Sequence, residues 1–375
     1  MKHNPMSKVF SNSLLCLSFL VLTCCASKPT GEIEEYEINA VDAGMDSTCF
    51  SDVYDVDIIK LENNKNSIIS QVHKLIVNSK EILIYDNSSV PQVFAFDHSG
   101  KYITKIGKYG HAKNEYYDII DVCSNEKGDS IFFLLHDRIM IYDNNGKYVS
   151  SCSIDPKYRW NYIERRCDYG YVCASDYYAD NLISLCDNSF NVQRELVDTK
   201  NVTVEHGSYV WNPICSSHGK IIFCDFYFTS IYVTDTKTLH TTCYRINTGN
   251  TAPIEEVKNG IKEYDKFLDV QFDGECVFGH IIHNKRPNVY KFNIKSKSFI
   301  IHGYEDYYPD IETYHDGCYY ATKNPSFLLS LLKGRPLFME QKTYNALMKA
   351  LEPYADDMNE MDNLYVLKLK KKTKI

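Results

Sequence analysis

The sequence predicts an all-β fold, because its apolar residues come in short runs that are rich in β-branched and aromatic side chains. Tyrosine is abundant, with 30 residues, whereas glycine and proline number 17 and 11 among 375 residues. Runs such as Glu81–Tyr85 and Val93–Phe96 are separated by Asp, Asn, Gly and Ser. Strands joined by polar turns have this pattern.

The runs repeat at a nearly regular spacing. An Asp or Asn that precedes a turn marks five successive units, and the steps between these markers are 46, 44, 48 and 58 residues. The markers are Asp97, Asp143, Asp187, Asp235 and Asn293. A repeat of about 40–50 residues with several short strands is typical of propeller blades. A sixth unit opens at Cys318–Ala321 and closes at Leu364–Leu369, so the sequence predicts a six-bladed β-propeller.

The turns and the ends of the sequence fit a ring of such units. In the first two units the marker is followed within three residues by Ser-Gly or Asn-Gly, which supply the positive φ of a tight hairpin. One blade cannot bury both of its faces alone, so we expect the units to cover one another. The segment Val53–Leu61 precedes the first full unit, and we expect it to pair with the last blade and close the ring.

One irregular segment, at about residues 325–363, interrupts the sixth unit. Within it, Ser326–Leu332 and Thr343–Leu351 have helical spacing, and Pro353 follows the second run. We expect a small helical insert in the last blade, packed on one rim.

The first residues have the pattern of a targeting segment. Lys2 and Lys8 precede the apolar run Leu14–Leu22, which is too short to span a bilayer as a mature helix. We therefore expect a lipoprotein signal peptide at residues 1–24, a tether at 25–50 and the propeller at 51–375.

The apolar run ends in Leu22-Thr23-Cys24-Cys25, which is similar to a bacterial lipobox. Cys25 fits best as the lipidated residue, and Cys24 is the alternative. Several acyl chains on one cysteine hold a protein firmly to a membrane. The expected location is the cell envelope, as an outer-membrane lipoprotein facing the periplasm or the cell surface. An ordinary secretory signal and a short membrane anchor remain as alternatives.

The charge of the body excludes some partners. Residues 1–24 hold two lysines and no acidic residue, so without them the 41 basic residues become 39 against 49 acidic ones, a net charge of −10. An acidic body argues against nucleic acid as a partner and against a charge-driven membrane contact. The expected membrane contact is the lipid anchor.

The 14 cysteines of an exported protein suggest disulfides, but their settings favour free thiols. Five of them lie inside predicted strands, where cysteine behaves as a small buried hydrophobic residue. These are Cys173, Cys186, Cys224, Cys243 and Cys276. No C-x-x-C motif occurs in the chain, so it has neither a zinc knuckle nor a thioredoxin-like motif.

The stretch Gln92–Gly110, QVFAFDHSGKYITKIGKYG, is similar to an NHL-type propeller repeat. From about residue 50 to 370 the chain resembles the six-bladed β-propeller lipoproteins of Bacteroidetes. Those carry GKFLRKIGRRGRGPGEY in the first blade, whereas here Gly107–Tyr116 replaces its second half and Ala112-Lys113-Asn114 stands in place of Gly-Pro-Gly. The final strand, with Leu367–Lys370, matches that family loosely. The resemblance implies the fold, and it carries no shared activity.

The sequence contains no motif of a known catalytic site, so we assign no catalytic, cofactor or metal residues. G-x-S-x-G, H-E-x-x-H, P-loop and EF-hand patterns are absent. His280 and His283 are the nearest to a ligand pair, but their separation of three residues sends them to opposite faces of a strand.

Two aromatic segments form the candidate ligand face. Both lie in or just before a predicted innermost strand, in adjacent blades, and aromatic rings beside Arg and Asn suit sugar or peptide binding. Their residues are Trp160, Tyr162 and Arg165 in one segment and Tyr209, Trp211 and Asn212 in the other. The competing interpretation is that both tryptophans fill contacts between blades.

Two hypotheses for function follow. The first is a non-enzymatic binding or scaffold module that recognises a glycan, a peptide or an envelope protein through one propeller face. The second is a polysaccharide hydrolase or lyase with its site at the channel mouth. Convergent titratable groups with shifted pKa values at the mouth would favour the enzyme.

Overall fold

Short strands in antiparallel meanders make up most of the structure, which confirms the all-β prediction. This computed structural model describes residues 33–46, 48–125, 127–165, 170–175, 179–198, 213–225, 228–252, 264–304 and 306–372. The chain from Gly31 to Ile375 forms one compact unit. Among the described residues, no helix has the length and apolar character needed to cross a membrane.

Four sheets have four strands each. The first comprises β3 (Val72–Val77), β4 (Ile82–Asp86), β5 (Gln92–Phe96) and β6 (Tyr102–Ile106). The second comprises β7 (Asp121–Ser124), β8 (Ser130–Leu134), β9 (Arg138–Asp143) and β10 (Tyr148–Ser153). The third comprises β11 (Trp160–Arg165), β12 (Tyr171–Ser175), β13 (Asn181–Cys186) and β14 (Val192–Asp198). The last is ordered β24 (Thr313–His315), β25 (Cys318–Lys323), β26 (Tyr365–Lys371) and β2 (Tyr54–Lys60).

Two further meanders are joined into a ten-stranded sheet. One comprises β15 (Ile214–Ser217), β16 (Lys220–Asp225), β17 (Ser230–Asp235) and β18 (Thr241–Asn247). The other comprises β19 (Lys266–Phe267), β20 (Gln271–Phe272), β21 (Cys276–His283), β22 (Arg286–Asn293) and β23 (Ser298–Tyr304). Strand β1 (Glu34–Asp46) joins them, because it pairs in parallel with β18 through Glu34–Asn39 and with β23 from Ala40 onward.

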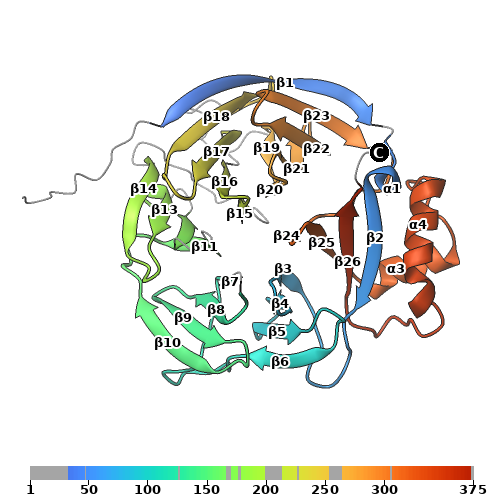
Figure 1. Cartoon of the computed structure of the whole chain (residues 1–375), viewed down its shortest axis with the longest axis horizontal. Helices are drawn as coiled ribbons and strands as arrows, with labels where there is room; N and C mark the ends of the chain where they lie inside the picture. Colours follow the sequence, from blue (N-terminus) through green and yellow to red (C-terminus); the bar gives the residue numbers. More distant parts are fainter. Residues whose placement is uncertain are drawn as a thin grey trace, which may run out of the picture. The chain divides into compact units, whose positions relative to one another are not determined.

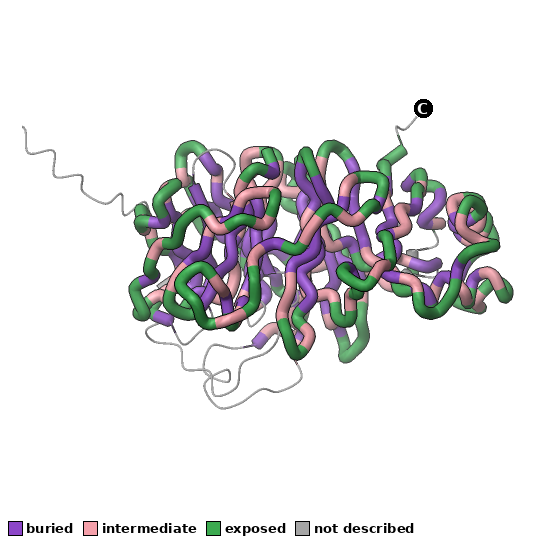
Figure 2. Tube along the Cα trace, turned by 90° about the horizontal axis from the view of Figure 1, so that it is seen from below, coloured by how far each residue is buried: buried purple, intermediate pink, exposed green. Residues whose placement is uncertain are grey.

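The meanders follow one another around a common centre, as in a β-propeller (Figure 1). The first strand of each meander lies nearest the centre, and β1, β2, β6, β10 and β14 lie on the outside. Buried residues run through the strands while most turns are exposed (Figure 2). Strands covered on both faces have continuous apolar runs, and all five residues of β4 are buried.

Successive meanders are held together by hydrophobic clusters. One cluster unites Tyr85 of the first sheet with Phe133 of the second, and another unites Leu75 of the first sheet with Val366 of the last. Gly100 also connects these two sheets, because a Cβ on it would lie 2.1 Å from the carbonyl oxygen of Lys60 at the end of β2. Its φ of 89° lies in the left-handed region, as expected for this turn.

The marker residues of the repeat cap the turns. Asp97 Oδ1 accepts hydrogen bonds from the backbone N–H groups of Ser99 and Lys101, at 2.8 and 3.0 Å. The remaining markers make the same kind of contact with the backbone two to four residues ahead, and they are Asp143, Asp187, Asp235 and Asn293. A short acceptor side chain at this position stabilises the turn, which explains why it recurs.

The predicted strand before the first unit and the helical insert are both confirmed. Strand β2 pairs antiparallel with β26 from Tyr54 to Lys60. Between β25 and β26 lie α3 (Pro325–Lys333), α4 (Gln341–Leu351) and the 3₁₀ helix η2 (Glu352–Tyr354). Leu347 and Leu351 of α4 pack in one cluster with Ile58 of β2. The insert therefore covers the outer strand of its sheet (Figure 1).

The structure differs from the tether expected at residues 25–50. Within that range, Glu34–Asp46 forms β1, and the short helix α1 (Phe50–Val53) begins before β2. In β1, Ile38 is the one described residue that is buried, and the apolar alternation of Tyr36, Ile38 and Ala40 is too short to reveal the whole strand. Its backbone pairing with two sheet edges stabilises it instead.

The cysteines of the described part of the chain agree with the prediction of free thiols. Ten are described, all are unpaired and eight of them are buried. Burial raises the pKa of the Cys173 and Cys215 thiols well above the usual range, so these groups are structural and inert.

Candidate functional site

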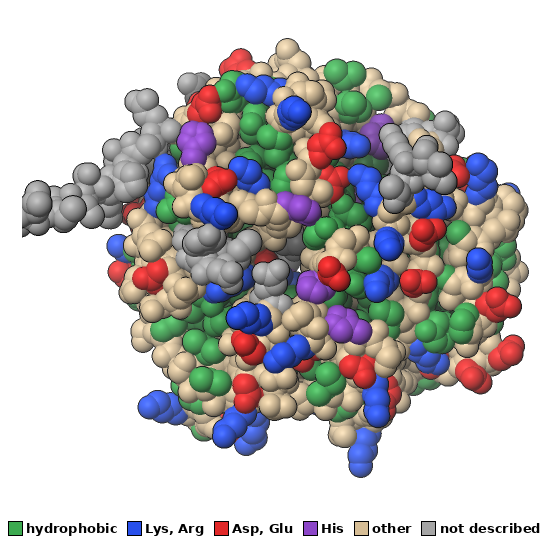
Figure 3. Space-filling model, viewed as in Figure 1, with side chains coloured by type: hydrophobic (Ala, Val, Ile, Leu, Met, Phe, Trp, Pro, Cys, Tyr) green, Lys and Arg blue, Asp and Glu red, His purple; other side chains and the backbone are tan. Residues whose placement is uncertain are grey.

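A cavity of about 310 Å³ lies at the centre, where the innermost strands end. Its lining residues come from the C-terminal ends of β3, β7, β11, β15, β20 and β24 and from the hairpins that follow them. Histidine side chains gather around the middle of the face shown in Figure 3. Every meander contributes an innermost strand to this cavity.

Charged groups on β3, β7 and β11 form one side of the cavity, where Lys74 and Glu164 line it and the buried Asp121 contacts Lys74. Lys74 Nζ lies 3.0 Å from both carboxylate oxygens of Asp121 and 3.8 Å from Glu164 Oε2. Asp121 is buried and also accepts the backbone N–H of Ile163 at 2.8 Å. This charged side (Lys74, Asp121 and Glu164) ties three successive sheets together.

Burial and mutual charge shift the pKa values of Lys74 and Glu164 on the charged side. Burial opposes the charged form of Lys74, but the carboxylates of Asp121 and Glu164 outweigh it and raise the pKa of this ammonium. Burial raises the pKa of Glu164, against the opposing effect of Lys74 and with the added repulsion of Asp121. One ammonium is thus shared by two carboxylates.

Aromatic rings on β20 and β24 and in the hairpin after β15 form the opposite side. The ring of His218 lies 5.1 Å from that of Tyr314 and 5.9 Å from that of Phe272, between centroids. His218 Nε2 lies 3.4 Å from the Tyr314 hydroxyl, and His218 Nδ1 lies 2.9 Å from Ser217 Oγ. We call His218, Phe272 and Tyr314 the aromatic side.

Glu312 supplies a further carboxylate to the lining. It accepts hydrogen bonds from Thr322 N and Oγ1 at 2.6 and 2.5 Å, and burial raises its pKa. Gln271 Nε2 donates to the backbone oxygen of Glu312 at 3.1 Å. This bond connects β20 to the residues that lead into β24.

The structure places the described residues of the predicted ligand face in three different settings. Trp160 is 4% exposed, stacks on Tyr158 and donates from Nε1 to Ser184 Oγ at 3.1 Å. It fills the core between sheets, which is the competing interpretation. Tyr162 is half-buried and packs against a core cluster. Arg165 lines the cavity.

The remaining predicted residues cannot be placed. Tyr209, Trp211 and Asn212 lie outside the described residues, as do Cys24 and Cys25. The proposed meeting of Trp160 with Trp211 and the choice of lipidated cysteine therefore stay predictions.

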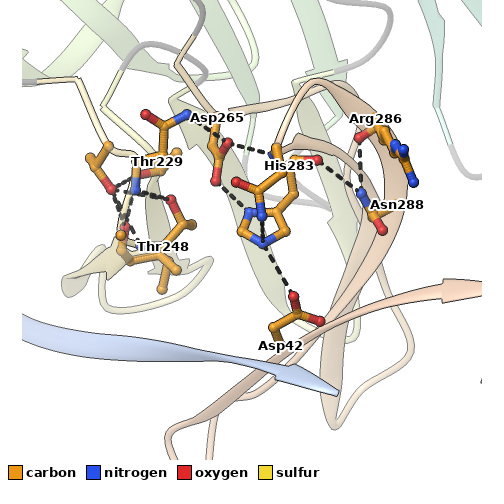
Figure 4. Close-up of polar contacts among 12 residues, drawn as sticks. Asp42, Thr229, Thr248, Asp265, His283, Arg286 and Asn288 are labelled. Atoms are coloured by element: carbon orange, nitrogen blue, oxygen red, sulfur yellow. Dashed lines mark hydrogen bonds and ion pairs between the residues drawn. The ribbon is translucent and has the colours of Figure 1, made fainter. Parts of the chain in front are cut away.

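The two histidines of β21 contact different carboxylates, as their spacing predicts. His280 Nδ1 lies 2.7 Å from Asp269 Oδ2. His283 Nδ1 lies 2.5 Å from Asp265 Oδ2, and its Nε2 lies 3.7 Å from Asp42 of β1 (Figure 4). Within the described ranges, no three His, Cys, Asp or Glu side chains are grouped so that they could hold a metal ion.

Apart from Arg165, the cavity residues were not predicted from the sequence. A weak signal existed, because Lys74 and Asp121 are charged residues inside otherwise apolar strand patterns, and such residues are rarely buried without a partner. For the aromatic side no such signal exists, since His218 and Tyr314 lie 96 positions apart and only the ring brings them together.

Comparisons with solved structures agree with the fold. A protein of Bacteroides fragilis that is named as an exported protein is 14% identical, with a TM-score of 0.69 over 90% of this chain and 100% of that one. A DUF4221 family member from Bacteroides vulgatus is 10% identical, with a TM-score of 0.51 over 85% and 97%.

At such identities these likenesses bear on the fold alone. None of the curated proteins compared matches the chain. One protein family does match, over residues 36–370. Because the match spans nearly the whole described unit, the chain belongs to the family called Domain of unknown function (DUF4934).

Proposed function

We propose that the protein is a lipid-anchored envelope protein with a closed, six-bladed β-propeller body. Closure is supported by the pairing of β2 with β26 and by the cluster that unites Leu75 with Val366. In this arrangement β2, from the N-terminal part of the chain, and the C-terminal strand β26 share the last blade. Cys25 carries the lipid in this proposal, and Cys24 is the alternative.

The proposed location is the outer membrane, facing the periplasm or the cell surface. The signal-like residues 1–24 support it, and so does the likeness to a Bacteroides fragilis protein named as exported. Palmitate labelling in the parent, lost in Cys25→Ser and retained in Cys24→Ser, is the expected result. Labelling that persists in both single variants and is absent in the double variant would contradict the assignment to Cys25 alone.

The function that the geometry supports best is non-enzymatic binding of a small glycan in the central cavity. One observation carries it: a single cavity is lined both by aromatic rings and by carboxylates. Rings pack against the apolar face of a sugar, and planar polar groups accept its hydroxyl protons. A peptide or an envelope protein remains the alternative ligand.

A glycan array tests this function on the unit that begins at Gly31, which is compact by itself. Tyr314→Ala should abolish the binding seen with the parent, because it removes a ring of the aromatic side that lines the cavity and packs against His218. Tyr117→Ala is the matched control, since Tyr117 is 40% exposed and is absent from the cavity lining. Binding that survives Tyr314→Ala, or an array with no bound glycan, would contradict the proposal.

The second candidate function is a polysaccharide hydrolase or lyase at the same cavity. The observation that favours it is the raised pKa of Glu164 and Glu312, both caused first by burial, because a carboxyl group that keeps its proton can act as a general acid. Mass spectrometry of the bound glycan after incubation decides between the two. Shortened products that disappear in Glu164→Gln would establish the enzyme.

A further inference from the structure

Carboxylates outnumber cations in the lining of the central cavity. Among the described residues that line it, Glu164, Glu312 and Asp316 carry carboxylates, whereas Lys74 and Arg165 carry the permanent positive charges. The histidines of the lining are His218 and His315.

Both cations are held by other groups of the protein. Lys74 is bound by both oxygens of Asp121, at 3.0 Å each. Arg165 donates from Nη1 to Asn188 at 3.1 Å, and its guanidinium lies 4.8 Å from the centre of the Tyr171 ring. Lys74 is therefore neutralised first by Asp121, and the guanidinium of Arg165 contacts the neutral groups of Asn188 and Tyr171.

Within the charged side, Glu164 is the carboxylate that a ligand can reach. Its side chain is 26% exposed, compared with 3% for Asp121. Its contact to Lys74 is the longer one, at 3.8 Å. The cluster of Lys74, Asp121 and Glu164 holds one positive and two negative groups, and an uncompensated carboxylate away from bulk water is costly. A cation that enters the cavity would remove this cost.

We infer that the ligand of this cavity carries an ammonium group, which Glu164 binds while the aromatic side packs against the ring that bears it. The inference rests on the proposed glycan binding and deepens it, because it selects an amino sugar over a neutral one. An ammonium has three N–H donors and no acceptor, so it suits a wall with an excess of carboxylate oxygens. Ionised pairs form stronger hydrogen bonds than neutral groups do.

Isothermal titration at pH 6 with three sugars of the same ring size tests the inference. The probes are glucosamine, glucose and N-acetylglucosamine, of which only glucosamine presents a charged amine. Glucosamine should bind about tenfold more tightly than glucose, the size expected for one charge-assisted hydrogen bond. N-acetylglucosamine should bind no better than glucose.

The variant Glu164→Gln should lower the affinity for glucosamine to that of the same variant for glucose, so that the tenfold preference is lost. Retained glucose binding shows that the variant is folded. Glu37→Gln is the matched control, because Glu37 is an exposed residue of β1, and it should leave the tenfold preference intact.

The outcomes separate the inference from the function on which it rests. Equal affinities for glucosamine and glucose would overturn the inference and leave glycan binding standing. A preference that survives Glu164→Gln would overturn the role of Glu164. An array and a titration that both show no sugar bound would overturn the proposed function as well.

Discussion

The two sides of the central cavity are built from different interactions. On the charged side, Lys74 and Asp121 are tied to each other at 3.0 Å and span neighbouring sheets. On the aromatic side, His218 and Tyr314 meet through ring contact and one weak polar contact of 3.4 Å. The difference indicates a division of labour, in which Lys74 and Asp121 maintain the fold, whereas Glu164 and the aromatic side are available to a ligand.

The largest expected effect on stability is that of Asp121→Ala, because it leaves Lys74 buried beside a single distant carboxylate. Breaking one half of a buried ion pair costs about 3–5 kcal/mol of unfolding free energy. Urea unfolding measures this loss. The control is Asp118→Ala, whose carboxylate is 40% exposed and pairs with the exposed His136, and exposed pairs contribute at most about 1 kcal/mol. Equal losses of unfolding free energy in both variants would contradict the stabilising role given to the charged side.

A smaller effect on stability is expected for Trp160→Phe. This variant tests whether the indole of Trp160 in β11 also stabilises the fold. The change keeps a ring against Tyr158 but leaves the buried hydroxyl of Ser184 without its donor. We expect a loss of about 1–3 kcal/mol with unchanged glycan binding. A variant that keeps the parent's thermal stability and loses glycan binding would show that Trp160 contacts the ligand.

The pH dependence of stability should reveal the His280–Asp269 pair, which faces the last sheet next to the aromatic side. Burial opposes protonation of His280, but the hydrogen bond and charge of Asp269, with Asp310, outweigh it and raise the pKa. Because the folded pKa is raised, the stabilisation is complete below the unfolded value of 6.5 and is lost as the pH rises through the folded pKa.

Unfolding free energies of the parent and of His280→Gln, measured from pH 5 to 9, test this sign. The advantage of the parent over the variant should shrink as the pH rises. Lys323 Nζ lies 3.3 Å from Asp310, and the parent and the variant share this contact, so the difference between them reports on His280. An advantage that grows with pH would contradict the assignment.

The smallest effect is expected at the outer rim, for Asp42→Asn in β1. Asp42 is 60% exposed and its carboxylate lies 3.7 Å from His283 Nε2, so we expect a loss of about 0.5 kcal/mol or less. Hydrogen exchange of the β1 amides measures it locally. A loss as large as that of Asp121→Ala would show that the rim, and not the centre, maintains the fold.

The repeat was readable in the sequence because each turn needs an acceptor side chain at one position, as Asp97 shows. The pairing of β2 followed from the same pattern. Strand β1 was missed, since its residues are mostly exposed and its parallel pairing with β18 and β23 depends on the ring being formed. The cavity was missed for a related reason, because Glu164 and Tyr314 acquire their common surroundings only when the meanders close around a centre.

The most direct test of the central claim is a crystal structure of the unit from Gly31 to Ile375 with the glycan that the array selects. The account predicts the sugar inside the central cavity, with its ring against Tyr314 and a polar group within hydrogen-bond distance of Glu164. A sugar bound on the outer rim or on the helical insert, with the cavity unchanged, would contradict it.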